Sequence, residues 1–284
     1  MRTFARFILA ALPLASTACA RESEPTAPDH RTIAGMSRRA DVKATSIACG
    51  ATLLTDLTLE SDLACPGDAI IVGADDIRIN LNGHTIAGSG VGIGITLRTR
   101  QNVSIGGGIV RGFVTGIFLA TSTDIVIKEN GFTANREGVF LNGSSGNVVK
   151  NNVAWQNQLR GIMLRPTLSG VISTNNEVVD NVLTDNPSGI LVTSQPGNTL
   201  KGNTISGSSF AAIDFTGGAG ASGNVVKGNL LTLSAAGIRF GAGWTQNEFI
   251  GNTISTNTCG VQGPAAGNTF TGNLFSGNGA DSCP

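Results

Sequence analysis

The stretch from Gly189 to Asn203, Gly-Ile-Leu-Val-Thr-Ser-Gln-Pro-Gly-Asn-Thr-Leu-Lys-Gly-Asn, contains both of the patterns that decide the fold. It begins with Gly-Ile-x-apolar and ends with Asn-x-apolar-x-x-Asn, and both patterns recur every 21 to 29 residues. Recurrence at such a period indicates stacked units that bury their apolar residues against one another. The first pattern, once with Ala in place of Gly, starts at Gly92, Gly116, Gly138, Gly161, Gly189, Ala212, Gly237 and Gly260.

Apolar and outward-facing residues alternate inside each unit, as at Ile190 and Val192 and again at Leu200 and Ile205. Alternation with a period of two is typical of a half-buried strand and not of a helical stripe. Three short strands in about 23 residues make one turn of a β-solenoid. The sequence therefore predicts an all-β, single-stranded parallel β-helix of about eight to nine turns, roughly 40 Å long at about 4.8 Å per turn.

The asparagine pattern has a physical reason at the corners of such a helix. An inward amide both donates and accepts hydrogen bonds, so it can pair with equivalent amides one turn before and one turn after. We therefore expect a buried structural ladder formed by Asn152, Asn181, Asn203, Asn229, Asn252 and Asn273.

The segment Asn80-Leu-Asn-Gly-His-Thr-Ile86 and the columns after it resemble the right-handed β-helix repeat region that the pectate-lyase superfold shares with NosD-type periplasmic proteins. The resemblance covers residues 49 to about 280 and implies a right-handed parallel β-helix outside the cytoplasm, usually with polysaccharide as ligand. Lyases, hydrolases, esterases, epimerases and non-catalytic surface proteins share that superfold, so the resemblance selects no reaction. His84 belongs to the opening motif, where a capping hydrogen bond is the expected role.

The N-terminus is typical of an exported protein. Arg2 and Arg6 precede a short apolar run, which predicts a signal peptide over residues 1–19. The end of this segment resembles a bacterial lipoprotein box with Cys19 as the lipidated residue, and ordinary cleavage after Ala20 is the alternative. Residues 20–47 are polar and lack an apolar period, so we expect a tether or poorly ordered lead-in before a β-helix over residues 48–284.

Four further cysteines remain in the predicted body. An even number in an oxidising compartment favours disulfides, and their spacing suggests Cys49 with Cys65 and Cys259 with Cys283. A metal site is disfavoured because the ligands would come from opposite ends of the chain, without a CxxC motif. No cofactor is expected.

Composition narrows the function. Lys plus Arg and Asp plus Glu are both 19, so no basic field attracts nucleic acid. The chain has 2 His and no Tyr, so the common general bases are scarce. The motifs that mark pectate lyases, polygalacturonases and alginate epimerases are absent.

The superfold implies that a binding groove would follow one sheet, so the outward residues of the Gly-Ile-x-apolar strand are the first candidates. This column begins apolar and ends polar, and it comprises Gly94, Phe118, Phe140, Met163, Leu191, Asp214, Arg239 and Gln262. Asp214 and Arg239 lie one turn apart, within reach of an ion pair, and Glu137 and Arg160 form a second such pair. Ladder pairs of this kind also occur without any function.

Two longer connections, 165–175 and 216–223, would flank the polar end of this column. We therefore place the candidate groove there, with Asp214 and Arg239 as candidate catalytic residues. The expected substrate-binding residues, whose arginines could hold a uronate carboxylate, are Arg160, Arg165, Met163, Leu191, Phe140 and Phe118.

Two functions remain open. The first is binding of an acidic polysaccharide, with lyase or epimerase chemistry if there is a reaction. A glycosidase needs two carboxyls about 5 to 9.5 Å apart, whereas Glu137 and Asp214 would lie roughly 14 Å apart. The second is a non-catalytic surface scaffold whose strip from Phe118 to Leu191 docks a partner. An outward column of lysines, interrupted by Val179, could bind an anionic polymer or only keep the sheet soluble; it comprises Lys128, Lys150, Lys201 and Lys227.

Overall fold

The structure is a computed structural model that describes residues 47–217 and 220–284. The predicted signal peptide, the predicted lipidation site Cys19 and the predicted lead-in before residue 47 lie outside these residues. Every element in the described part of the chain is a β-strand, and every pairing between strands is parallel. No helix there is long and apolar enough to cross a membrane.

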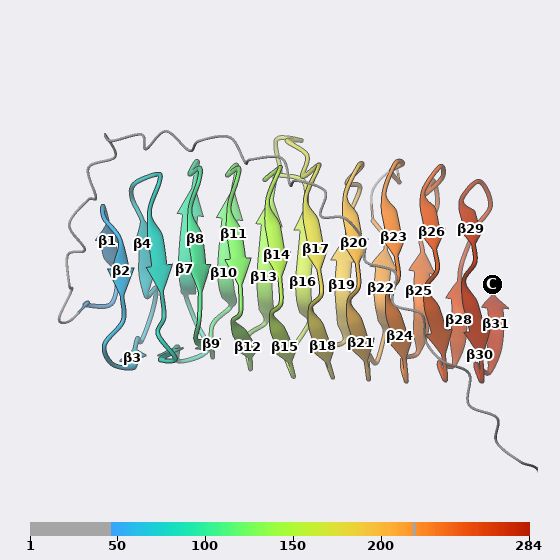
Figure 1. Ribbon diagram of the computed structural model, residues 1–284, viewed down its shortest axis with the longest axis horizontal. Helices are drawn as coiled ribbons and strands as arrows, with labels where there is room; N and C mark the ends of the chain where they lie inside the picture. Colours follow the sequence, from blue (N-terminus) through green and yellow to red (C-terminus); the bar gives the residue numbers. More distant parts are fainter. Residues whose placement is uncertain (1–46, 218–219) are drawn as a thin grey trace, which may run out of the picture. The chain divides into compact units, whose positions relative to one another are not determined.

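The chain winds through three parallel sheets, visiting each once per turn, and the turns stack side by side (Figure 1). Sheet A has eleven strands. They are β1 (Ala51–Leu53), β4 (Ile70–Val72), β7 (Ile93–Arg98), β10 (Thr115–Ala120), β13 (Glu137–Asn142), β16 (Arg160–Arg165), β19 (Ser188–Val192), β22 (Ala211–Phe215), β25 (Ala236–Phe240), β28 (Cys259–Gln262) and β31 (Ala280–Cys283).

Sheets B and C have ten strands each. Sheet B contains β2 (Leu57–Thr58), β5 (Arg78–Asn80), β8 (Ser104–Gly106), β11 (Val126–Lys128), β14 (Val148–Lys150), β17 (Glu177–Val179), β20 (Thr199–Lys201), β23 (Val225–Lys227), β26 (Glu248–Ile250) and β29 (Thr269–Thr271). Sheet C contains β3 (Leu63–Ala64), β6 (Thr85–Ala87), β9 (Ile109–Arg111), β12 (Gly131–Thr133), β15 (Val153–Trp155), β18 (Val182–Thr184), β21 (Thr204–Ser206), β24 (Leu230–Thr232), β27 (Thr253–Ser255) and β30 (Leu274–Ser276).

The predicted β-solenoid is confirmed, but it has about ten turns where the sequence predicted eight to nine. The underestimate lies in the first turns, strands β1 to β6, which lack the Gly-Ile-x-apolar pattern. Their corners use exposed carboxylates in place of buried amides: Asp56 accepts a hydrogen bond from the Arg78 amide at 2.8 Å. Asp62 accepts one from the Thr85 amide at 2.9 Å. Because an exposed Asp is common in any loop, these turns carry no readable signal.

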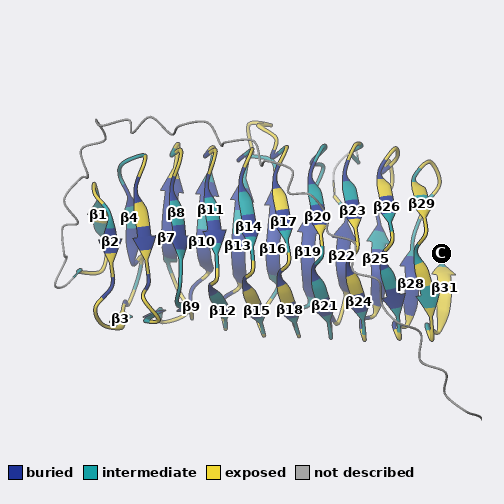
Figure 2. Cartoon of the chain, viewed as in Figure 1, coloured by how far each residue is buried: buried dark blue, intermediate teal, exposed yellow. Residues whose placement is uncertain are grey.

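The core consists of inward side chains stacked in files, one residue per turn. In sheet B one file runs through Ile79, Ile105, Ile127 and Val149, all at most 1% exposed. Figure 2 shows that buried residues recur in the strands of successive turns. Burying one such side chain stabilises the fold by about 1.5 to 3 kcal/mol, so the stack gains stability from each added turn.

Asparagine ladders line the three corners, and the sequence pattern revealed only two of them. Asn203 shows the geometry: its Nδ2 donates to Val178 O at 2.9 Å and to Asn229 Oδ1 at 3.0 Å. Its own backbone amide also donates to Asn229 Oδ1, at 2.8 Å. This ladder, the second of the three, lies between sheets B and C. It contains the six asparagines predicted from the sequence, and Asn130 forms its first rung.

The third ladder lies between sheets C and A. Its members follow those of the second ladder by five residues, a spacing visible in the sequence but not used above. Asn135, Asn157 and Asn186 form its first part, and Asn257 and Asn278 its second part. In the two turns between these parts, serines occupy the position: Ser208 and Ser234.

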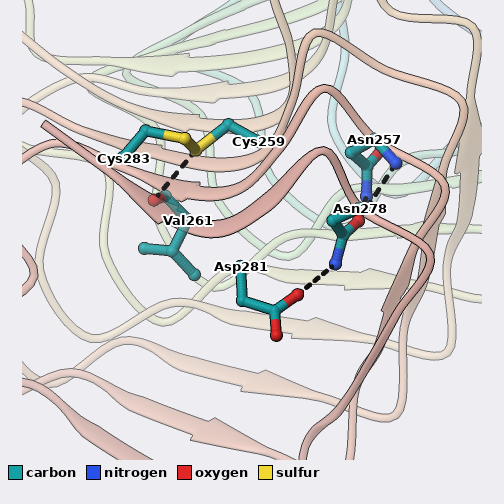
Figure 3. Close-up of a disulfide and its surroundings, with 6 residues drawn as sticks. All are labelled: Asn257, Cys259, Val261, Asn278, Asp281 and Cys283. Atoms are coloured by element: carbon teal, nitrogen blue, oxygen red, sulfur yellow. Dashed lines mark hydrogen bonds between the residues drawn. A yellow bond between two sulfur atoms is a disulfide. The ribbon is translucent and has the colours of Figure 1, made fainter.

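Both predicted disulfides are confirmed. Cys49 and Cys65 join the first turn to the start of the second, and Cys259 and Cys283 join β28 to β31. Figure 3 shows the second disulfide near the last rung of the third ladder, where Asn278 Nδ2 donates to Asp281 at 3.0 Å. Two disulfides favour an oxidising, extracytoplasmic compartment.

Candidate functional site

The outward column of sheet A is continuous, with one correction to its first residue. Phe118 pairs in register with Thr96, and Gly94 pairs with Gly116, so Thr96 and not Gly94 occupies the column. The turn contains two overlapping matches to the repeat, at Gly92 and at Gly94, and the second is in register. The pattern alone could not choose between them.

Asp214 on β22 and Arg239 on β25 form a two-pronged ion pair. Arg239 Nε lies 3.1 Å from Asp214 Oδ1, and Nη2 lies 3.2 Å from Oδ2. The Asp214 side chain is 3% exposed and that of Arg239 is 24% exposed. The guanidinium also lies over the ring of Phe210, with its carbon 3.6 Å from the ring centroid, a cation–π contact. Arg239 is thus fixed from two sides, while Nη1 makes no contact with Asp214.

A hollow of about 320 Å³ opens at this pair, a size near the lower end for ligand sites. Its walls come from sheet A and from the corner between sheets C and A. We call it the sheet A hollow, and its lining residues are Leu159, Arg160, Pro187, Ser188, Leu191, Ser209, Phe210, Asp214, Thr216 and Arg239.

Arg160 on β16, three turns before Arg239, adds a second positive charge to the hollow. Its Nη1 lies 3.2 Å from Glu137 Oε1, and Arg136 Nε approaches the same oxygen at 3.6 Å. Glu137, with a side chain 9% exposed, is as enclosed as Asp214. The two pairs share one design, in which a buried carboxylate holds a partly exposed arginine.

Burial raises the pKa of the Asp214 carboxyl above its ordinary value, and Arg239 opposes that shift. Burial likewise raises the pKa of Glu137, against the effect of Arg136 and Arg160. In each case desolvation disfavours the charged carboxylate more than the neighbouring guanidinium favours it. Both carboxyls therefore take up protons at a higher pH than exposed ones.

The apolar end of the column is less open than the sequence suggested. Phe118 and Phe140 pack edge to face with ring centroids 5.2 Å apart, and Arg98 lies 5.2 Å from the Phe118 centroid. Met163 and Leu191 are each only 5% exposed. This burial leaves little apolar surface for the docking of a partner.

The predicted groove loops lie elsewhere. Among the described residues, the loop that follows β16 contributes nothing to the lining of the hollow, and the loop that follows β22 contributes Thr216 alone. Arg165 is exposed and does not line the hollow, whereas Arg160 and Leu191 do. The expected wall of long loops is replaced by the corner on the other side of sheet A, at Pro187 and Phe210.

Phe210 is the main residue that sequence reasoning missed. It lies two residues after Ser208, where the third ladder first has Ser in place of Asn. Ser208 Oγ is buried and has no hydrogen-bond partner within residues 47–217 and 220–284. A break in the third asparagine column was the signal that would have pointed to this corner.

His84 and the lysine column lie outside the lining of the sheet A hollow. His84 Nδ1 lies 3.3 Å from Asp62 Oδ1, at a corner far from the hollow in sequence order. Lys128 pairs with Lys150, and Lys201 with Lys227, on the outer face of sheet B, interrupted as expected by Val179. Within the described residues, no three His, Cys, Asp or Glu side chains lie close enough to hold a metal ion.

A family model described as the right handed beta helix region matches residues 68–231, more than half of the chain. The chain belongs to this right handed beta helix family. The match begins just before β4 and ends inside β24, so it includes the turns that carry Glu137, Arg160 and Asp214. No curated protein matches the sequence.

Solved structures of this β-helix type resemble the chain in fold at low sequence identity. The mannuronan C-5 epimerase A-module of Azotobacter vinelandii is 16% identical with a TM-score of 0.60, over 81% of this chain and 82% of that one. An alginate lyase from a Paenibacillus species is 17% identical with a TM-score of 0.53, over 80% and 90%. The catalytic domain of a GH87 α-1,3-glucanase in complex with nigerose is 16% identical with a TM-score of 0.53, over 81% and 60%. At these identities the likeness establishes the fold alone.

Proposed function

We propose that this extracytoplasmic β-helix binds an acidic polysaccharide along sheet A, with the sheet A hollow as its central site. The observation that carries the proposal is Arg239, held by Asp214 and Phe210 at the mouth of a hollow that also contains Arg160. Arg160 on β16 and Arg239 on β25 lie three strands apart in sheet A, roughly 14 Å, so one polyuronate chain running across the strands would place different carboxylates at the two arginines.

Arg239 is fitted to hold a carboxylate and not to remove a proton. A guanidinium stays protonated in proteins, so Arg239 cannot be a general base. Asp214 uses two of its five N–H groups, which leaves the others for a ligand. We therefore assign Arg239 and Arg160 to carboxylate binding, and Asp214 and Glu137 to orienting them. Leu191 and Phe210 would contact the sugar rings.

A reaction at this site would be of the lyase or epimerase class. Asp214 and Glu137 lie three strands apart in sheet A, roughly 14 Å, which is too far for a pair of glycosidase carboxylates. Neutralisation of the uronate carboxylate by Arg239 would make the adjacent carbon-bound proton more acidic. The named structural neighbours include an epimerase and an alginate lyase but also a glucanase, so the choice of reaction class depends on the spacing of the carboxylates and not on the neighbours.

The location of the protein is part of the proposal. Lipidation of Cys19, with cleavage of the signal peptide immediately before it, would tether the β-helix to the cell envelope. In that case Cys19→Ala would move the protein from the membrane fraction to the soluble fraction, whereas ordinary secretion predicts no difference between the two.

Calorimetry with a panel of oligouronates tests the proposal. The wild-type protein should bind oligogalacturonate or oligomannuronate and not a neutral malto-oligosaccharide of equal length. Arg239→Ala and Arg160→Ala should each weaken binding, whereas Arg111→Ala, an exposed arginine on sheet C, should not. Absence of binding to every uronan would refute the proposal. In parallel, absorbance of unsaturated uronate tests the lyase reaction, and loss or gain of C5 label in solvent tests the epimerase reaction.

A further inference from the structure

Three consecutive glycines, Gly106, Gly107 and Gly108, remove the side chains from one turn at the corner between sheets B and C. Gly106 occupies an outward position between Asn80 and Lys128 in the register of sheet B. Because both neighbours have long side chains and Gly106 has none, a hollow of about 310 Å³ forms there. Arg78 and Lys128 stand at its sides.

A second hollow, of about 590 Å³, continues around the same corner onto sheet C. Gly131 lies between Ile109 and Val153 in the register of β12, and a Cβ at Gly131 would meet the ring of Trp155 at 3.1 and 3.2 Å. The indole therefore lies over the place that the glycine leaves empty. Both hollows are lined by Gly107 and Glu129, so we treat them as one corner groove.

The floor of the corner groove carries an unused hydrogen-bond acceptor. Asn130 is the first rung of the second ladder and is 2% exposed. In later rungs the Oδ1 atom accepts from the asparagine one turn earlier, but Gly108 occupies that earlier position. Asn130 lines the groove, and its Oδ1 has no partner in the described part of the chain. An unpaired buried acceptor of this kind is rare and calls for an explanation.

Charge and shape differ between the two ends of the corner groove. At the sheet B end, the Arg78 side chain forms no ion pair with a carboxylate of the described residues, although Asp56 accepts a hydrogen bond from the Arg78 backbone amide, and Lys150 lies beside Lys128 in register. Glu129 Oε1 is 3.8 Å from Lys128 Nζ and offsets one of these three positive charges. Like charges side by side in a sheet repel each other, so an anion there would be stabilising. At the sheet C end, Trp155 and the 43% exposed Val153 form an apolar wall.

We propose that the corner groove is a second saccharide-binding site, which takes an acidic oligosaccharide with a sugar ring against Trp155 and a carboxylate toward Lys128 and Arg78. A pyranuronate has an apolar C–H face and a charged edge, which match the two ends of the groove. A single-stranded nucleic acid also combines flat rings with anions, but the chain as a whole has 19 basic and 19 acidic residues and offers no extended basic field. The site does not depend on the sheet A hollow.

Fluorescence can report on this site alone. The chain has 2 Trp and no Tyr, and Trp244 is only 1% exposed, whereas Trp155 is partly exposed on sheet C. Collisional quenching by acrylamide should therefore act mainly on Trp155. Saturating oligogalacturonate should lower the quenching constant of the accessible tryptophan at least about twofold, and a neutral malto-oligosaccharide should not.

Variants of the full chain separate the two sites. Trp155→Phe should abolish the response, and the Arg78→Ala, Lys128→Ala double variant should lose protection while keeping the fluorescence of the folded protein. Lys227→Ala, in the same column but several turns away, should keep protection, as should Arg239→Ala in the sheet A hollow. Protection in Arg239→Ala, whose calorimetric binding is weakened, would show that the corner groove works alone.

Four results would overturn the inference: no protection by any oligouronate, protection unchanged in the double variant, protection lost in Arg239→Ala, or protection by an oligothymidylate but not by uronates. The sheet A proposal would survive the first of these if calorimetry still showed binding that Arg239→Ala weakens. Conversely, protection without any effect of Arg239→Ala on binding would leave the corner groove as the only uronate site.

Discussion

The corner between sheets C and A differs between the middle of the stack and the turns on either side. Before and after the hollow, buried asparagines continue the ladder from turn to turn. In the turns of Asp214 and Arg239, Ser208 and Ser234 replace them, and Phe210 emerges beside the break. A scaffold that repeats every 23 or so residues thus departs from its repeat at one of its two buried ion pairs, whereas the other, between Glu137 and Arg160, lies in turns with an intact ladder.

The intact ladder should be the most sensitive part of the molecule. Asn203→Ala would remove the acceptor of the Asn181 backbone and side-chain amides, and would remove the side-chain donor to Val178 O and Asn229 Oδ1. Each buried group left unpaired costs about 1 to 3 kcal/mol, so we expect a loss of about 2 to 4 kcal/mol in the free energy of unfolding. Urea denaturation measures it. Asn273→Ala, in a partly exposed rung near the C-terminus, is the matched control and should lose less; equal losses would argue against burial as the cause.

The two buried ion pairs should make ligand binding depend on pH. The pKa of Asp214 is raised, so its protonated form persists to higher pH in the folded protein than in the unfolded chain. As the pH falls through that pKa, Asp214 becomes neutral: its carbonyl oxygen still accepts a hydrogen bond that orients Arg239, but its charge no longer competes with the carboxylates of the ligand, which stay charged down to about pH 3.5. Wild-type affinity for oligouronates should therefore rise several-fold toward acid pH.

The Asp214→Asn variant sharpens this comparison. The affinity of this variant for oligouronates should change less with pH than that of the wild type. The change that remains would come from Glu137, whose pKa is also raised. The sign for stability is the same: the contribution of each carboxyl is present at low pH and is lost as the pH rises through the folded-state pKa. Affinity that falls toward acid pH in the wild type would contradict the assignment of Arg239 to the ligand.

Restoring the ladder at the break should stabilise the protein slightly. In the regular turns each ladder asparagine lies beside a glycine of the preceding turn, as Asn186 lies beside Gly161. The equivalent neighbour of Ser208 is Gly189, so Ser208→Asn has room for a side chain that hydrogen-bonds to Asn186. We expect a gain of about 1 kcal/mol in unfolding free energy, measured by thermal denaturation.

The neighbouring serine provides the contrast. At a regular turn, a Cβ on Gly237 would lie 3.1 Å from Asn257 Nδ2, so glycine and asparagine occur together. At Ser234 the corresponding neighbour is Ala212, whose Cβ already fills that space. Ser234→Asn should therefore be neutral or destabilising, and a gain as large as that of Ser208→Asn would show that the steric explanation is wrong.

The smallest effect is expected from an arginine that the sequence placed in the groove. Arg165 is exposed and lies outside the lining of the hollow, whereas Arg160 lies inside it. Arg165→Ala should change oligouronate affinity by less than about twofold, in the range of an exposed charge, while Arg160→Ala weakens it more. If Arg165→Ala had the larger effect, the binding site would have to include the long loop after β16.

The repeat made the fold and the ion pair between Asp214 and Arg239 predictable, because residues in equivalent positions of a solenoid lie one turn apart. The even number and the spacing of the cysteines made the disulfide pairing predictable. The register at Gly94 was not predictable, since two overlapping matches fit the same turn. Phe210 was missed because it belongs to a corner and not to the repeating strand, and only its contact with Arg239 reveals its place. Arg165 ends β16 in register with Asn142, and the repeat alone did not show that the hollow opens at the other end of this strand, where Arg160 lies.

The central claim is that Arg239 holds a carboxylate of an acidic polysaccharide at the sheet A hollow. Calorimetric titration of wild type, Arg239→Ala and Arg239→Lys with one oligouronate tests it most directly. Loss of a charged hydrogen-bonding group should weaken binding by about tenfold to a hundredfold in Arg239→Ala, with partial recovery in Arg239→Lys. Identical affinities in wild type and Arg239→Ala, with both proteins folded, would contradict the account.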